Sequence, residues 1–125
     1  PGLLPHSEYS FPVPQSDVLP TVAGLCKISY TNTTMGRDVL SPFILNNAAL
    51  QVAFIYNPDK RRMGIVKDSF FISYGIEGAL KEQVYSLKEN ATPVLSKTQQ
   101  QQYFQLTEAW YQTARYLLLN NKAGH

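Results

Sequence analysis

Apolar residues recur at helical spacing over the last third of the chain. They lie three or four residues apart, which keeps them on one side of a helix with about 3.6 residues per turn. Ser96 and Gln99 have the spacing of a capping box, and Thr98 is an alternative cap. The pattern therefore predicts a long C-terminal helix over residues 97–121. Its core-facing row consists of Tyr103, Leu106, Trp110, Ala114 and Leu117.

A second apolar row runs beside the first on this predicted helix and consists of Phe104, Tyr111 and Leu118. The helix also holds the only Trp of the chain and three of its eight Tyr. Both residue types offer a large contact area with a polar tip, and they are common at protein interfaces. We expect the first row to face the core and the second row to bind a partner. The simpler alternative is that this whole side of the helix faces the core.

Three further segments alternate between apolar and polar positions, as half-buried strands do. They predict strands at about residues 21–31, 48–56 and 65–74. Residues 57–60, with the sequence Asn-Pro-Asp-Lys, have the composition of a turn between the second and third strands. These two strands are therefore expected to form an antiparallel hairpin. The apolar side of the first strand consists of Val22, Cys26, Ile28 and Tyr30.

Two shorter helices complete the predicted elements. Ser41 followed by Pro42 suits the start of a helix, so a short helix or turn is expected over residues 42–47, before the second strand. A helix is also predicted over residues 77–89, because Leu80, Val84 and Leu87 share one face and Pro93 prevents its continuation.

Residues 1–20 hold five of the eight prolines of the chain, which predicts an extended arm or linker. Apolar side chains still occur along this arm, and Tyr9 and Phe11 are the aromatic ones. A purely disordered tail would carry fewer of them. We therefore expect Tyr9 and Phe11 to lie on the domain surface or to bind another chain.

These elements predict a single globular α+β domain over residues 21–125, preceded by the arm. An antiparallel sheet of three or more strands would be covered by the helices at 77–89 and 97–121. A chain of 125 residues fits one domain and can bury roughly two-thirds of its unfolded surface.

The charge of the chain is low and balanced. Eleven basic and nine acidic residues give a net charge of +2, which does not favour nucleic acid or an anionic membrane as partner. Charged residues make up only 16%, so amides and hydroxyls supply much of the polar surface, which favours an extracytoplasmic location. No apolar run is long enough to insert into a bilayer. Because the chain begins with Pro, we expect a processed protein or an excised domain.

The sequence lacks the residues that most catalytic and metal sites need. Its one cysteine, Cys26, allows neither an internal disulfide nor a cysteine-rich metal site. His6 and His125 lie near the two ends, so a Cys–His catalytic pair is not expected. No phosphate-binding glycine loop, nucleophile elbow or paired-histidine metal motif occurs. We therefore expect no enzymatic activity, no cofactor and no metal.

Two charged features remain as candidate sites. Lys60, Arg61 and Arg62 form the only basic cluster and could contact an anion from the predicted hairpin loop. Asp68 interrupts the apolar strand predicted at 65–74, where an ionised carboxylate would need a partner or an altered pKa. A structural salt bridge or an exposed strand end is the simpler interpretation of Asp68, and an acid–base role is the alternative.

The sequence favours a non-catalytic protein–protein interaction or assembly module, which would be the folded part of a larger extracytoplasmic or structural protein. Its partner would be another protein or a second copy of the chain. The alternative is a small-molecule-binding fold with hydrolase or isomerase chemistry at Asp68. Its apolar pocket would be lined by Tyr56, Phe71, Tyr74 and Trp110. A weak nucleic-acid binder is a third possibility, which requires the basic cluster to join Arg37, Lys67 or Arg115 in space.

Overall fold

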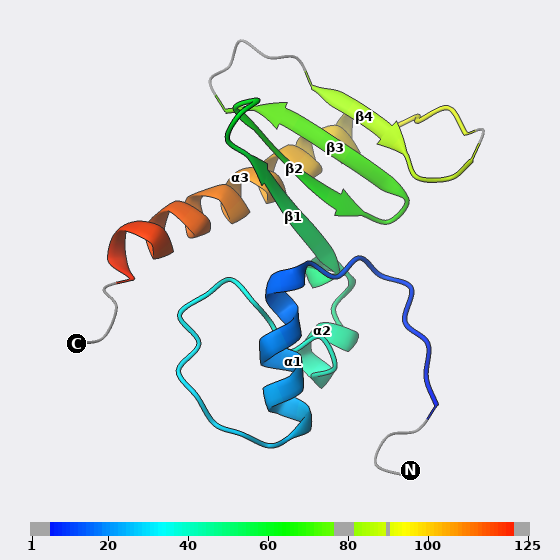
Figure 1. Cartoon of the computed structure of the whole chain (residues 1–125). Helices are drawn as coiled ribbons and strands as arrows, with labels where there is room; N and C mark the ends of the chain where they lie inside the picture. The colour runs from blue at the N-terminus through cyan, green and yellow to red at the C-terminus, as the bar shows by residue number, and fades with distance from the viewer. Residues whose placement is uncertain (1–5, 77–81, 90, 122–125) are drawn as a thin grey trace.

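A four-stranded antiparallel sheet with one long helix behind it forms the upper part of the molecule, and a smaller lobe of short helices and loops lies below (Figure 1). This is the computed structural model of the chain, and it describes residues 6–76, 82–89 and 91–121. The α+β class predicted from the sequence is confirmed. In chain order the elements are η1 (Gln15–Asp17), α1 (Val18–Leu25), α2 (Pro42–Leu45), η2 (Ala48–Leu50), β1 (Val52–Asn57), β2 (Arg62–Lys67), β3 (Phe70–Gly75), β4 (Gln83–Ser86) and α3 (Lys97–Asn120).

The sheet is a simple meander with the strand order β1-β2-β3-β4. The turn between β1 and β2 lies where the sequence predicts it, and its Asn57 side chain accepts a hydrogen bond from the Lys60 backbone at 3.0 Å. The hairpin between the second and third predicted strands is thereby confirmed, with β1 antiparallel to β2. β1 begins only at Val52, because η2 occupies the first residues of the range predicted as strand.

The prediction of one strand over 65–74 is wrong, because the chain reverses at Asp68 and Ser69. β2 and β3 pair on either side of this two-residue turn, with Lys67 opposite Phe70. Asp68 has a positive φ of 55°, a left-handed conformation that aspartate tolerates better than most residues. The polar pair that interrupts the apolar run is therefore the turn itself.

The prediction of a helix over 77–89 is also wrong where it can be compared with the structure. Gln83–Ser86 form β4, which pairs with β3, and residues 77–81 lie outside the described residues. The Leu87 backbone N–H donates to the Ser69 carbonyl at 2.8 Å, and the Tyr85 ring stacks on Phe71 at 5.6 Å. Pairing with the free edge of β3 thus overrides a helical apolar pattern.

The strand predicted over 21–31 is wrong as well, since Val18–Leu25 form the helix α1. Its sequence, VLPTVAGL, is apolar at almost every position and does not discriminate between the two periodicities. α1 begins inside the range predicted as an extended arm. The short helix expected near 42–47 is present as α2, with Pro42 at its first position.

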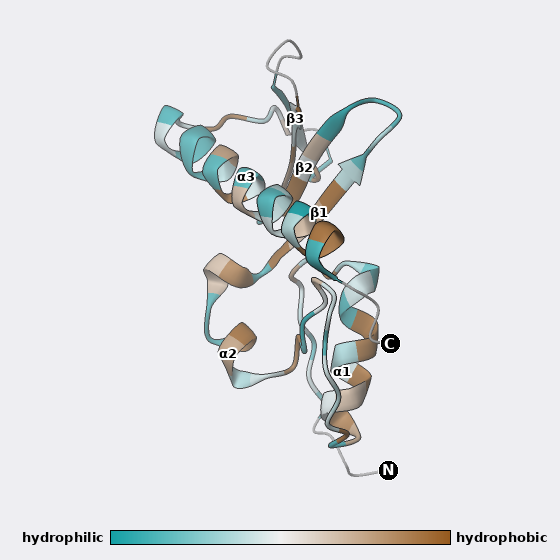
Figure 2. Ribbon diagram, turned by 90° about the vertical axis from the view of Figure 1, so that its left-hand side faces the viewer, coloured by the Kyte–Doolittle hydropathy of each residue, from teal (hydrophilic) through white to brown (hydrophobic). Residues whose placement is uncertain are grey.

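The long C-terminal helix is confirmed as α3, and its capping box is the one that the sequence indicates. Ser96 Oγ accepts from the Gln99 backbone at 3.2 Å, and Gln99 Oε1 accepts from the Ser96 backbone at 3.0 Å. The N-terminal half of α3 packs on one face of the sheet (Figure 2), where Val52, Ile65 and Ile72 are fully buried. Burying each of these side chains stabilises the fold by about 1.5–3 kcal/mol. Among the described residues, no helix is both long and apolar enough to span a bilayer.

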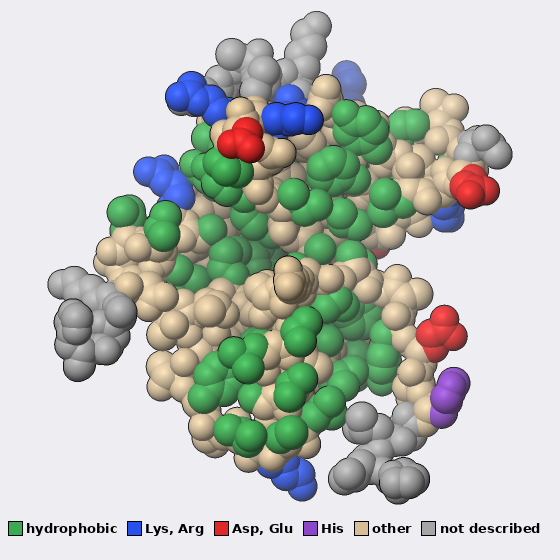
Figure 3. Space-filling view, viewed as in Figure 1, with side chains coloured by type: hydrophobic (Ala, Val, Ile, Leu, Met, Phe, Trp, Pro, Cys, Tyr) green, Lys and Arg blue, Asp and Glu red, His purple; other side chains and the backbone are tan. Residues whose placement is uncertain are grey.

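No helix of the described residues lies on the opposite face of the sheet (Figure 1). The strand registers place Ile55, Gly64, Phe71 and Tyr85 on this face, which we call the open face. Figure 3 shows hydrophobic side chains gathered on it. The structure therefore leaves a second apolar surface beside the core.

Candidate functional site

α1 presents apolar side chains to solvent on most of its surface. Only Pro20 and Ala23 are buried, whereas four larger side chains are between 43% and 66% exposed. Figure 3 shows hydrophobic atoms gathered over this lobe. We call the four residues the α1 patch: Val18, Leu19, Val22 and Leu25.

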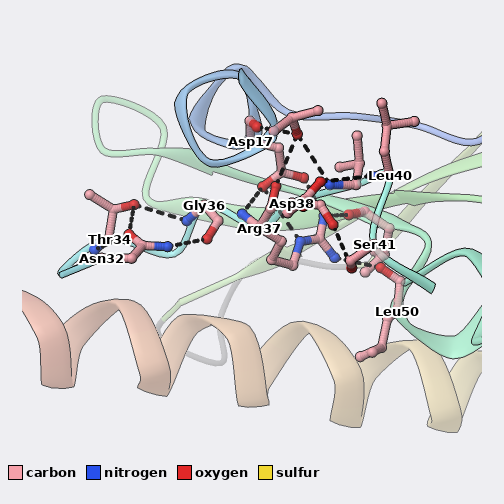
Figure 4. A network of polar contacts seen from close by, with 12 residues as sticks. Asp17, Asn32, Thr34, Gly36, Arg37, Asp38, Leu40, Ser41 and Leu50 are labelled. Atoms are coloured by element: carbon pink, nitrogen blue, oxygen red, sulfur yellow. Dashed lines mark hydrogen bonds and ion pairs between the residues drawn. The ribbon is translucent and has the colours of Figure 1, made fainter. Parts of the chain in front are cut away.

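An ion pair between the buried Asp17 and the half-buried Arg37 holds α1 in place, as Figure 4 shows. Asp17, directly before α1, is fully buried, and its Oδ2 lies 2.7 Å from Nη2 of Arg37. Its Oδ1 accepts a second bond, of 2.8 Å, from the Arg37 backbone N–H. Because these donors satisfy the carboxylate, burial of its charge is tolerated.

Arg37 also connects the lobe to the sheet and to α3. Its guanidinium donates to the carbonyl oxygen of Val52 at 2.8 Å and to that of Leu50. The guanidinium lies 4.9 Å from the centre of the Trp110 ring, a cation–π geometry. Asp17 and Arg37 therefore fix the α1 patch relative to the rest of the fold.

The three residues of the second apolar row on α3 do not share one surface. Phe104 packs edge-on against Tyr74, with ring centres 5.2 Å apart. Tyr111 packs against Tyr56 at 5.9 Å, and Leu118 is 81% exposed. A hollow of about 290 Å³, which we call the Tyr56 hollow, brings Tyr111 and Leu118 together. It is lined by Tyr56, Tyr111, Ala114, Arg115 and Leu118.

The two aromatic residues of the arm lie next to each other, with the rings of Tyr9 and Phe11 6.0 Å apart. Phe11 is half-buried and lines a hollow of about 320 Å³, whose wall also includes Asp68 and Gln51. The structure thus places this part of the arm beside the turn between β2 and β3.

The structure does not bring Arg37 or Lys67 to the basic cluster. The Arg62 guanidinium donates to the side-chain oxygen of Ser73 at 2.5 Å and to its carbonyl oxygen at 2.8 Å. Lys67 donates to the Ala48 carbonyl at the other end of β2, and Arg37 is paired with Asp17. Lys60 and Arg62 instead line a hollow of about 280 Å³ on the open face. Arg61, between them, is exposed.

Asp68 forms a hydrogen bond across the structure. Tyr103 donates its hydroxyl to Asp68 Oδ2 at 2.6 Å, and Lys67 lies 3.9 Å from Oδ1. Burial raises the pKa of Tyr103 to about 12, and the hydrogen bond and charge of Asp68 add to this effect. Asp68 is thus an exposed turn residue with a structural partner.

The aromatic pocket proposed as an alternative is not assembled as one cavity. Tyr56 and Tyr74 lie on the sheet face that α3 covers, whereas Phe71 lies on the open face. Trp110 stacks on Phe54 with ring centres 6.5 Å apart. The four aromatic residues are therefore divided between the two sides of the sheet.

Sequence reasoning missed the ion pair between Asp17 and Arg37. Asp17 lies among the prolines of the predicted arm, and Arg37 lies twenty residues later, so no local pattern connects them. Among residues 6–76, 82–89 and 91–121, no group of three or more metal-ligating side chains is present.

Comparisons with protein-family models, with curated protein sequences and with solved structures give no significant match. The functional argument therefore depends on the surfaces described above.

Proposed function

We propose that this chain is a non-catalytic protein–protein interaction module whose main contact is the α1 patch. The observation that carries this proposal is an eight-residue helix with four large hydrophobic side chains in solvent. Isolated exposed hydrophobic residues are normal, but contiguous exposed patches mark interaction sites. Among the described residues, exposed large hydrophobic side chains outnumber the buried ones.

The Asp17–Arg37 pair supports the same function, because it anchors the start of α1 to the sheet and to α3. A surface that is already ordered loses less conformational entropy on binding than a flexible one. Amphipathic or apolar helices that dock into a partner's groove are an established recognition mode. Tyr9 and Phe11 of the arm, and Phe104, Tyr111 and Leu118 of α3, are the further partner-binding residues that we propose.

We also propose that this module is extracytoplasmic, and the support for that location is the low share of charged residues, 16%. Amides and hydroxyls would keep such a module in solution once the apolar patches are covered by partners.

Site-directed photo-crosslinking in cells that express the chain tests the proposal. A photoreactive amino acid at Leu19 should give a discrete adduct with another protein chain. The same label at Glu108, an exposed residue of α3, should not. The double variant Leu19→Glu/Val22→Glu, labelled at Leu25, should lose the adduct while keeping the thermal midpoint of the wild type. Equal labelling at Leu19 and Glu108 would contradict the proposal.

A small-molecule site on the open face is the second candidate. Its support is the 280 Å³ hollow, in which the apolar side chains of Ile55, Phe71 and Tyr85 lie near the cationic Lys60. Such a hollow suits an apolar anion. A fluorescent fatty acid should bind the wild type and bind Phe71→Ala more weakly, whereas no saturable binding would remove this candidate.

A further inference from the structure

β1 is an edge strand, and only some of the backbone N–H and C=O groups on its outer side have hydrogen-bond partners. The ladder alternates, and the bond from the Ile76 backbone N–H to the Arg61 carbonyl fixes which residues of β2 face β3. It follows that Ala53, Ile55 and Asn57 bond to β2, while Phe54 and Tyr56 direct their N–H and C=O groups outward.

The guanidinium of Arg37 occupies the first part of this outer side. It bonds to the carbonyl oxygens of Leu50 and Val52. Beyond it, no described residue bonds to the outward backbone groups of Phe54 and Tyr56. β1 also has no charged residue or proline between Val52 and Asn57, although natural edge strands usually carry such protection.

The C-terminal part of α3 extends past this edge (Figure 1). The Tyr56 hollow lies there, between the β1 edge and α3, and the highly exposed Leu118 stands at its rim. The same surface therefore has both a cavity and a projecting apolar side chain. A two-fold axis can bring the projection of each copy to the cavity of the other, which is the requirement for an isologous contact.

We propose that the β1 edge and the Tyr56 hollow form a homodimer contact, in which β1 of two copies pair antiparallel and extend the sheet to eight strands. The two-fold axis passes beside Ile55, so that Phe54 of each copy lies opposite Tyr56 of the other. Leu118 of each copy enters the partner's hollow. This surface is separate from the α1 patch, so the dimer and the proposed function can fail independently.

The backbone of β1 is complementary to itself in this register. Phe54 and Tyr56 each offer one donor and one acceptor, and an antiparallel copy supplies the matching groups. The register ends with Pro58 of one copy beside Val52 of the other. Pro58 has no N–H to donate, and the Val52 carbonyl already accepts from Arg37, so no donor is missing there. A second copy therefore pairs with the backbone groups of Phe54 and Tyr56 and needs no bond to the Val52 carbonyl, which already accepts from Arg37.

Disulfide formation tests the register. Ile55 would face its own copy at a non-hydrogen-bonded position, where Cα atoms lie about 4.5 Å apart, which is within disulfide range. In a Cys26→Ser background, Ile55→Cys should oxidise to a covalent dimer. The matched control Tyr85→Cys, on the same open face but on β4, should remain monomeric. An Ile55→Cys variant that stays monomeric, equal dimer formation by Tyr85→Cys, or capture of a different protein by the thiol of Ile55→Cys would overturn the proposal.

Sedimentation velocity of the purified chain tests the contact of Leu118. Wild type should dimerise as its concentration rises, and Leu118→Arg should weaken the dimer by about tenfold or more, as expected for a charge introduced at an interface anchor. Leu119→Arg is the control, because Leu119 is also highly exposed but does not line the hollow. A wild type that stays monomeric, or equal effects of the two variants, would overturn the dimer. A Leu19 crosslink to another protein would still support the proposed function.

Discussion

The guanidinium of Arg37 lies 4.9 Å from the centre of the Trp110 ring, and its N–H groups also donate to the Asp17 carboxylate and to the Val52 carbonyl at the edge of β1. One side chain from a loop thus touches the N-terminal lobe, the sheet and α3. The surfaces that we assign to partners lie on either side of this contact. Asp17, which pairs with Arg37, directly precedes the α1 patch. The unpaired part of the β1 edge begins after Val52, whose carbonyl accepts from the Arg37 guanidinium.

Removing Arg37 should destabilise the fold strongly. Arg37→Met leaves the carboxylate of Asp17 buried without its cation, which typically costs about 3–5 kcal/mol. Urea denaturation followed by circular dichroism measures the free energy of unfolding. Arg115→Met is the matched control, because Arg115 is exposed and its loss should cost less than about 1 kcal/mol. Similar losses in the two variants would show that the Asp17–Arg37 pair has no structural importance.

Neighbouring positions of α1 should respond in opposite ways to a charge. Val22 is exposed and Ala23 is buried, so Val22→Asp should change stability by only about 0.5 kcal/mol, whereas Ala23→Asp should cost about 3 kcal/mol or more. Thermal or urea unfolding of the two variants gives the comparison. The strand predicted from the sequence would bury Val22 instead, so the reverse order would contradict the helix.

The start of α3 should depend on Ser96. Ser96→Ala removes the side-chain acceptor for the Gln99 N–H and should cost about 1 kcal/mol. Thr98→Ala should cost less, because Thr98 lies inside the helix and does not cap it. Denaturant midpoints of the two variants distinguish these positions, and a larger loss for Thr98→Ala would assign the cap to the alternative residue.

Alkaline pH should weaken the contact between Tyr103 and Asp68. The folded-state pKa of Tyr103 is raised from 10.0 to about 12, so the folded protein holds this proton more tightly than the unfolded chain. The resulting stability is fully present below pH 10 and is lost as the pH rises toward about 12. Burial raises the pKa of Tyr74 as well, which adds to the loss in the same direction.

Ultraviolet titration of tyrosinate can isolate this effect by comparison with Tyr103→Phe. Asp68→Asn should lower the pKa of Tyr103 but keep it above the usual value, because burial is the larger cause. Asp59→Asn, an exposed aspartate of the turn between β1 and β2, should leave the titration unchanged. An unchanged Tyr103 pKa in Asp68→Asn would remove the assigned role of the carboxylate.

Nucleic acid should not be a partner of the basic cluster. Arg37 and Lys67 are engaged elsewhere, so Lys60, Arg61 and Arg62 are not joined by them into a wider basic surface. Gel-shift titration with single- and double-stranded oligonucleotides at low salt should show no retardation. A shift that weakens with salt and disappears in Lys60→Ala would establish the third functional class instead.

The parts of the fold that local chemistry specifies could be predicted from the sequence. The capping residues Ser96 and Gln99, the long 3.6-residue period after them and the turn at Asn57 to Lys60 were sufficient for α3 and the first hairpin. Pro42 marked the start of α2 for a similar reason. Each of these signals involves groups within a few residues of one another, so the sequence contains the whole interaction.

Tertiary structure decided the remaining elements and both candidate surfaces. Val18–Leu25 became a helix where Asp17 meets Arg37, and Gln83–Ser86 became a strand because β3 offered a free edge. The apolar patterns there permit either structure, and partners distant in the sequence select one. By itself the sequence determined an α+β chain rich in aromatic contacts. Only the tertiary structure decided which apolar residues stay in solvent, because burial depends on which face each element turns toward the others.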